Sequence, residues 1–98
     1  MRIRWSARAG RDLDSIEAYI GLVNRAAAIS PVLDIIKVVK RLQDHPASGR
    51  PGRVAGTREL VLSNQPYIVP YRVRNNIIEI LRVFHTSRRI EKMELNKE

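Results

Sequence analysis

The stretch YIVPYRVRNNIIEILRVFH, residues 67–85, consists of two apolar runs joined by two asparagines. A two-residue hairpin turn requires positive φ at its central positions, and asparagine tolerates that conformation. The stretch therefore predicts an antiparallel hairpin, with strands at 67–74 and 77–84 and a turn at Asn75 and Asn76.

The register of this hairpin follows from the position of its turn. Arg72 is expected opposite Glu79, and Val69 is expected opposite Arg82. Pro70 has no N–H to donate to a neighbouring strand, so we expect a bulge or a strand end near it. The turn thus predicts the register of the whole hairpin, except near Pro70.

The two hairpin strands and an earlier strand at 57–62 are expected to form a meander with two different faces. One face is apolar enough to receive helices, and it holds Leu60, Leu62, Tyr67, Val69, Tyr71, Val73, Ile78, Ile80 and Phe84. The opposite face mixes apolar and charged side chains, and it holds Val61, Ile68, Pro70, Arg72, Arg74, Ile77, Glu79, Leu81, Val83 and His85. A mixed face of this kind usually binds a partner, unless the chain's own tail or first strand covers it.

The first half of the chain predicts a short strand at 2–5 and a helical hairpin. Ser6 can cap the first helix, whose apolar stripe is Leu13, Ile16, Ile20 and Val23. The second stripe is Val32, Ile35, Val39 and Leu42. The second helix begins either at Ser30 or near Asn24 with a kink at Pro31, and we prefer the earlier start. It ends before Pro46. The fold class is α+β, with an N-terminal strand and a helical hairpin packed on an antiparallel β-sheet.

The composition narrows the classes of protein and of site. The 98 residues suffice for one domain, which we expect over 1–90, followed by a charged tail over 91–98. The absence of cysteine and the two isolated histidines disfavour disulfides, a metal site or a cofactor. No apolar run approaches the roughly 20 residues that a membrane helix needs. We therefore expect neither export nor membrane insertion, and a cytoplasmic setting.

The positive charge is concentrated in the second half of the chain. The net charge is +8, and residues 49–90 hold eight arginines against two acidic residues. Three of these arginines, Arg50, Arg53 and Arg58, lie in the glycine-rich stretch GRPGRVAGTREL at 49–60. Because arginine makes forked contacts with phosphate and carboxylate, this distribution favours a polyanionic or acidic partner.

The order of these segments resembles the RelE/ParE superfamily of bacterial toxins from type II toxin-antitoxin pairs, and looks closer to ParE. The resemblance spans residues 2–89 and is carried by GRPGR at 49–53, GTREL at 56–60, YIVPYRV at 67–73 and IEILRVFH at 78–85. It implies an α+β fold with a helical hairpin on an antiparallel sheet. It also implies a cognate antitoxin that wraps the toxin with an amphipathic, largely acidic segment.

Two activities occur within this superfamily. RelE-like members resemble ribosome-dependent endoribonucleases that cut mRNA, whereas ParE-like members are similar to non-nucleolytic poisons of DNA gyrase. Residues that would serve a nuclease here are His85, Arg72 and Arg82. However, Thr86 stands where nuclease members often have a tyrosine, and residues 41–91 contain no lysine. We therefore favour gyrase inhibition over mRNA cleavage, and a toxin that is not itself an enzyme; if it is an enzyme, we expect an endoribonuclease.

The resemblance and the charge distribution together give two sets of candidate site residues. For contact with the target we expect Arg82, His85, Arg88, Arg89, Arg50, Arg53 and Arg58. For contact with the antitoxin we expect Ile16, Ile20, Val61, Ile68, Leu81 and Val83. Two arginines also have structural interpretations, since Arg72 can form a cross-strand ion pair and Arg82 can meet an acid such as Asp12 or Glu17.

Overall fold

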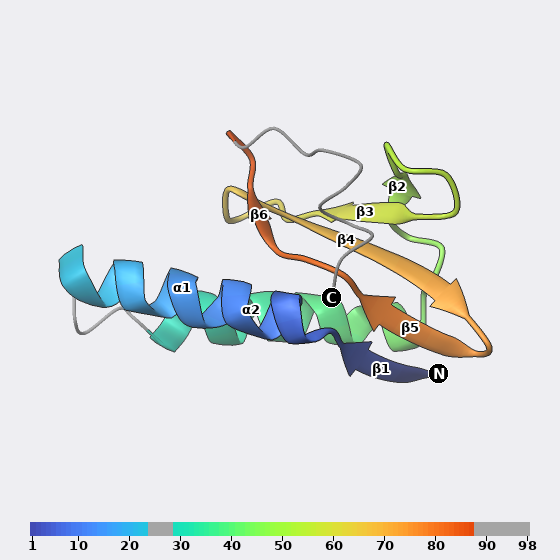
Figure 1. Cartoon of the computed structure of the whole chain (residues 1–98), viewed down its shortest axis with the longest axis horizontal. Coiled ribbons are helices and arrows are strands. Elements are labelled where there is room, and N and C mark those ends of the chain that lie inside the picture. Colours follow the sequence, from blue (N-terminus) through green and yellow to red (C-terminus); the bar gives the residue numbers. More distant parts are fainter. Residues whose placement is uncertain (24–28, 88–98) are drawn as a thin grey trace.

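The computed structural model describes residues 1–23 and 29–87, with both helices on one face of the sheet (Figure 1). Its elements in chain order are β1 (Arg2–Trp5), α1 (Ala7–Val23), α2 (Ile29–Lys40), the 3₁₀ helix η2 (Arg41–Gln43), β2 (Arg50–Pro51), β3 (Arg58–Val61), β4 (Tyr67–Arg74), β5 (Ile77–Ile80) and β6 (Phe84–His85). The α+β class and the helical hairpin on a sheet are confirmed.

The sheet is mixed, with the strand order β1-β5-β4-β3-β2 and with β6 also paired to β4. Strands β3, β4 and β5 pair antiparallel, as the meander predicted. The predicted strand at 77–84 is divided into β5 and β6, and β2 and β6 add antiparallel pairs that were not predicted. Strand β1 adds to the far edge in parallel with β5, and the chain between the two passes through the helices. Parallel neighbours need such a crossover connection, because a short turn cannot return the chain to the same direction.

Helix α1 begins directly after Ser6, as predicted. The Ser6 side-chain Oγ accepts a hydrogen bond from the Ala9 N–H at 3.0 Å, and the Ser6 carbonyl accepts one from the Gly10 N–H at 3.0 Å. Both bonds satisfy donors that the first turn of a helix leaves without intrahelical partners. Ser6 is therefore the N-cap that fixes where β1 ends and α1 begins.

Helix α2 is described from Ile29, so the preferred early start near Asn24 lies outside the described residues. Pro31 falls in the first described turn, where its missing N–H costs little. The helix tightens into η2 and ends before Pro46, as predicted. Its apolar stripe is buried throughout, at Val32, Ile35, Val39 and Leu42.

The β4–β5 hairpin has the predicted register near its turn. Asn75 and Asn76 adopt φ values of 55° and 61°, as the two central positions of a tight hairpin turn require. Arg72 pairs with Glu79, and the flanking pairs on either side follow the same alternation. The local turn chemistry thus sets the pairing over four residues of each strand.

The register slips by one residue beyond Ile80, where the predicted pairing of Val69 with Arg82 is wrong. Ile68 pairs with Phe84, so two residues of β4 face three residues of the other chain segment, 81–83. This arrangement is a β-bulge, and it lies beside the proline where the sequence predicted an irregularity.

Pro70 explains the position of the bulge. The Leu81 N–H donates to the Pro70 carbonyl at 2.9 Å. In a regular ladder the opposite residue would return a bond from its own N–H, but proline has none. The Ser6 hydroxyl donates to the Leu81 carbonyl instead, at 2.8 Å. The capping serine of α1 thus also satisfies the carbonyl that Pro70 leaves without a ladder partner.

The slip reverses the faces of the residues that follow it, because side chains alternate with a period of two. Val83 joins the main core beneath the helices, although it was predicted on the opposite face. Phe84, predicted in the core, packs instead with Ile68 and Leu81, and Val54 from the 49–58 loop contacts this second cluster. Both corrections follow from the one extra residue in the segment 81–83.

The main core lies between the helices and the sheet. It contains Ala9, Ile35, Val39, Leu42, Leu62, Val69, Tyr71, Ile78, Ile80 and Val83. Each large apolar side chain enclosed there contributes about 1.5–3 kcal/mol relative to exposure. Helix α1 extends past the sheet (Figure 1), and accordingly Leu22 and Val23 near its end are 86% and 69% exposed.

Candidate functional site

The loop before β3 is built around the hydroxyl of Tyr71. That hydroxyl accepts from the Gly49 N–H at 2.9 Å and donates to the Pro46 carbonyl at 2.7 Å. A Cβ at Gly49 would lie 2.6 Å from a Tyr71 ring carbon, so the close approach requires glycine. Arg58 donates from Nη1 to the carbonyls of Gly49 at 2.7 Å and Ala47 at 3.3 Å. Arg58, a candidate target contact, therefore also holds this loop.

Two other candidate arginines of the loop gather around the carboxylate of Glu59. Arg50 donates to Oε1 from Nη2 at 3.0 Å and from Nε at 3.3 Å. Arg53 donates its backbone N–H to Oε2 at 3.0 Å, while its Nε lies 3.7 Å away. Glu59 is 1% exposed, whereas the side chains of Arg50 and Arg53 are 53% and 47% exposed. The buried carboxylate thus positions two half-exposed guanidinium groups.

Glu79 holds a second group of arginines. Its Oε1 accepts from the Arg72 Nε at 2.7 Å and lies 3.4 Å from the Arg74 Nε, and its Oε2 pairs with Arg4. The hydrogen bond from Arg72, foremost among these contacts, holds the pKa of Glu79 below its usual range. The predicted cross-strand pair of Arg72 and Glu79 is therefore confirmed.

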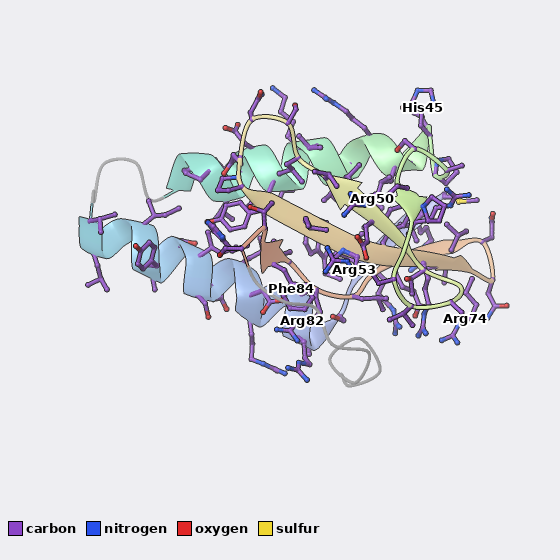
Figure 2. All side chains as sticks on the ribbon, turned by 90° about the horizontal axis from the view of Figure 1, so that it is seen from above. His45, Arg50, Arg53, Arg74, Arg82 and Phe84 are labelled. Atoms are coloured by element: carbon purple, nitrogen blue, oxygen red, sulfur yellow. The ribbon has the colours of Figure 1, made fainter. Side chains whose placement is uncertain are left out.

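Both carboxylate clusters lie on the sheet face that turns away from the helices. The pairing register puts Glu59, Arg72 and Glu79 on this side, and Figure 2 looks onto it with the helices behind. We call it the outer face and define its charged part as Glu59, Glu79, Arg4, Arg50, Arg53, Arg72 and Arg74. Sequence reasoning missed Arg4, because only the parallel pairing of Arg4 with Glu79 places it there.

Arg82 is enclosed rather than exposed at a surface. Its side chain is 4% exposed, and it donates from Nε and Nη2 to the Asp12 carboxylate on α1 at 2.7 and 3.0 Å. The Val83 N–H donates to the same carboxylate at 2.9 Å, and the Arg82 guanidinium carbon lies 4.5 Å from the centre of the Phe84 ring. The predicted acidic partner is confirmed, and its burial fits the structural interpretation of Arg82.

His85 is exposed at the end of β6. Its Nδ1 accepts a hydrogen bond from the Ser87 N–H at 3.1 Å and lies 2.7 Å from the Ser87 Oγ. His85 pairs with Tyr67, and the two rings meet edge to face at 5.7 Å. Since Tyr67 packs against the main core, the prediction that His85 shares a face with Arg72 is wrong. The register slip separates the two residues.

A groove of about 510 Å³ lies beside His85. It is lined by Asp12, Ser15, Ile16, Tyr19, Pro66, Tyr67, Val83, Phe84 and His85. Burial, and to a smaller extent Tyr19, raises the pKa of Tyr67 above its usual value. The Tyr67 hydroxyl therefore stays protonated at neutral pH, and it offers a hydrogen bond rather than a charge.

The six candidate antitoxin contacts divide by exposure. Ile68, Leu81 and Val83 are 4–5% exposed and belong to the two apolar clusters. Ile16 and Ile20 are partly buried on α1. Val61 is 46% exposed and lines a second groove of about 500 Å³ between α2 and β3.

Several expectations fall on residues that the structure does not describe. Arg88, Arg89 and the tail at 91–98 lie outside the described residues. Within residues 1–23 and 29–87, no cluster of side chains is suited to hold a metal ion. No helix of the same ranges is long and apolar enough to cross a membrane.

Comparisons with known proteins all find bacterial toxins of one superfamily. A family model described as the ParE toxin of the type II toxin-antitoxin system parDE matches residues 3–90. The candidate toxin Y4kP of Sinorhizobium fredii is 52% identical over 84 residues, which is 86% of each chain. Toxin RelE2 of Caulobacter vibrioides is 33% identical over 87 residues, 89% of this chain and 97% of RelE2.

A solved structure is similar over nearly the same range. It is a chain of the chromosomal ParDE toxin-antitoxin system from P. aeruginosa, with a TM-score of 0.81 and 35% sequence identity. The match covers 87% of this chain and 95% of that one. This chain therefore belongs to the ParE toxin family of the ParE/RelE superfamily, and it is the toxin of a type II toxin-antitoxin system, with an antitoxin as its partner.

Proposed function

We propose that this toxin inhibits DNA gyrase and does not cleave nucleic acid. The observation that carries the proposal is that the three residues of the nuclease hypothesis do not converge. Arg72 lies on the outer face, Arg82 is enclosed against α1, and His85 lies on the helix-facing side. Cleavage of RNA needs a base, an acid and cations around one phosphate, and these three side chains do not surround a common point.

The bonding of the two arginines supports the same proposal. Arg82 is 4% exposed and shares two hydrogen bonds with Asp12, so it would have to leave a buried ion pair to reach a phosphate. The Arg72 Nε donates a hydrogen bond to the Glu79 carboxylate. Among the three candidates, His85 alone carries an exposed imidazole, and one imidazole does not supply both proton transfers.

The test is a titration of purified, antitoxin-free toxin into a gyrase supercoiling reaction, with a parallel assay of mRNA in a translating ribosome extract. Inhibition of supercoiling with accumulation of cut DNA is the expected result. Cleavage of ribosome-bound mRNA with no effect on gyrase would overturn the proposal and establish the RelE-type activity. His85 and Arg72 would then be the first residues to replace.

The basic segment after β6 is the part of the toxin that we assign to the gyrase–DNA complex. Arg88 and Arg89 lie outside the described residues, and the assignment rests on their charge and on the family likeness. Replacing both with alanine is expected to lower toxicity without unfolding the protein. Alanine at Arg11 and Lys40, which are exposed on the helices, is the control with equal charge loss. Full toxicity of the Arg88 and Arg89 variant would refute the assignment.

We assign antitoxin binding to the apolar surface that remains accessible, namely the groove between α2 and β3 and the partly exposed stripe of α1. Val61 supports this assignment, because it is 46% exposed in the groove and lies beyond the two residues of β3 that β2 covers. Val61→Glu is expected to weaken copurification with the cognate antitoxin at least tenfold. Val73→Glu, at a residue that is 41% exposed at the hairpin end, is the matched control. Equal losses in both variants would contradict the assignment.

A further inference from the structure

We propose that the outer face binds the phosphate backbone of duplex DNA. This inference rests on the proposed function, because a toxin that acts on gyrase meets its target while that target holds DNA. It adds a surface that neither the candidate arginines after β6 nor the groove beside His85 includes. The surface consists of Arg4, Arg50, Arg53, Arg72 and Arg74 with the two carboxylates beneath them.

The first support is the sign and arrangement of the charges. Five arginines of the outer face stand against Glu59 and Glu79, which are the only carboxylates carried by strands β1 to β6. Both carboxylates are buried, at 1% and 6% exposure. A ligand approaching this face therefore meets guanidinium groups, and the acidic groups lie below them.

The second support is that the arginines are held in place while much of each side chain remains accessible. The side chains of Arg50, Arg53 and Arg74 are 53%, 47% and 58% exposed. Each guanidinium carries five N–H donors in a rigid fork. Arg72 and Arg74 both approach the Glu79 Oε1 atom through Nε, at 2.7 and 3.4 Å, and their side chains are 30% and 58% exposed. Fixed forks with accessible donors suit phosphate oxygens.

The spacing of the two clusters suits a duplex. Glu79 pairs with Arg72 on β4, and Glu59 pairs with the neighbouring Pro70 from the other side of β4. The clusters are thus two strand spacings apart, which is about 10 Å. Duplex DNA carries one phosphate charge per about 1.7 Å of its axis, so both clusters can meet phosphates at once.

The described part of the outer face carries no exposed aromatic ring, which favours a duplex over single-stranded RNA as its ligand. Proteins that bind single strands stack the bases on exposed aromatic side chains. Trp5, Tyr67 and Tyr71 belong to the core side of the sheet, and Phe84 is 1% exposed. The described part of the outer face therefore offers cations without a stacking platform, as expected for contact with a paired backbone.

The experiment measures the anisotropy of a fluorescent duplex of about 20 base pairs titrated with antitoxin-free toxin, at salt concentrations between about 50 and 200 mM. The variant Arg53→Gln/Arg74→Gln removes two charges from the outer face. It leaves both carboxylates their closest partners, because the Nε atoms of Arg53 and Arg74 lie 3.7 and 3.4 Å from them. The control Arg11→Gln/Lys40→Gln removes two exposed charges from the helices.

The expected result is a loss of about two units in the slope of log affinity against log salt, with a fall of about tenfold in affinity at the lowest salt. The control variant is expected to keep the slope of the unmodified toxin. Equal slopes for the outer-face variant and the unmodified toxin would overturn the inference. Tighter binding of a single-stranded RNA of the same length would also overturn it.

Gyrase inhibition measured on the same preparations separates the two proposals. Toxin that binds the duplex through the outer face without inhibiting gyrase would support the inference and refute the proposed function. Toxin that inhibits gyrase but shows no salt-dependent binding to the duplex would refute the inference and support the proposed function.

Discussion

The two ends of β4 place arginine in opposite environments. At the hairpin end the register is regular, and Arg72 and Arg74 stand on the outer face around the carboxylate of Glu79. At the Pro70 end the register slips, and Arg82 is enclosed against Asp12 of α1. One extra residue in the segment opposite Pro70 thus decides which side chains after Ile80 face the helices and which face outward.

Asp12 provides the strongest test of the enclosed end. Asp12→Ala is expected to lower the free energy of unfolding by about 3–5 kcal/mol, because it leaves a buried guanidinium without its partner. Urea denaturation followed by circular dichroism measures the change. The loss is large because Arg82 is 4% exposed, and its Nη1 already has no hydrogen-bond partner among the described residues.

The double variant Asp12→Ala/Arg82→Met is the control for this prediction. Replacing both partners of a buried ion pair with apolar groups is often close to neutral. We therefore expect the double variant to recover most of the lost stability. A single variant as stable as the unmodified toxin would show that Arg82 finds another partner or reaches water.

Substitutions on the outer face are expected to lower the free energy of unfolding by less than Asp12→Ala does, and by unequal amounts. Arg72→Ala should cost about 1.5–3 kcal/mol, since it removes a hydrogen bond between charged groups from a buried carboxylate. Arg74→Ala should cost about 0–1 kcal/mol, the usual range for an exposed ion pair. The two residues contact the same Oε1 atom, at 2.7 and 3.4 Å, so they form a matched pair. If urea denaturation shows equal losses of unfolding free energy in Arg72→Ala and Arg74→Ala, the assigned difference in burial is contradicted.

The hairpin end was the part of the fold most accessible from the sequence. The two asparagines fix the turn locally, and the side-chain period then carries the register outward from it. The capping serine and the apolar stripe of α2 were predictable for the same reason, since each depends on neighbours within a few residues. The partner of Arg82 was also predictable, because an enclosed guanidinium requires an acid nearby.

The slip and the outer face were not predictable in full, because both depend on contacts between distant segments. The sequence indicated an irregularity near Pro70, but it did not reveal that one extra residue would move Val83 inward and Phe84 outward. Arg4 reaches Glu79 through pairing between residues 75 positions apart. Such pairings are set by the whole sheet, and they decide which arginines form a surface.

The pH dependence of stability tests the ion pairs at the hairpin end. Contacts with Arg72 and its neighbours lower the pKa of Glu79 in the folded protein. The resulting stabilisation is fully present above the pKa of a glutamate carboxyl in the unfolded chain, about 4.3. It is lost as the pH falls through the lower pKa of Glu79 in the folded protein. The stability difference between the unmodified toxin and Glu79→Gln should therefore shrink on acidification. Parallel stability curves from neutral pH down to acid would contradict this origin.

The smallest effect that we predict is a coupling between Ser6 and Pro70. The Ser6 hydroxyl caps α1 and also donates to the Leu81 carbonyl, which has no ladder donor because Pro70 lacks an N–H. Ser6→Ala therefore removes a cap and leaves a carbonyl without its donor. Pro70→Val restores an N–H directed at that carbonyl. The contacts of Arg82 and Phe84 still hold the bulge in place.

If this account of the bulge is correct, Ser6→Ala costs less in the Pro70→Val background, because only the cap is then lost. We expect a coupling of about 1 kcal/mol, the net contribution of one hydrogen bond, from urea denaturation of all four proteins in the cycle. Thr57→Val, which removes a hydroxyl bonded to the Val54 carbonyl at 2.6 Å, should show no coupling to Pro70→Val. Additive losses for Ser6 and Pro70 would mean that the N–H restored at position 70 does not bond to the Leu81 carbonyl, and that the Ser6 hydroxyl does not replace a ladder bond lost to the proline.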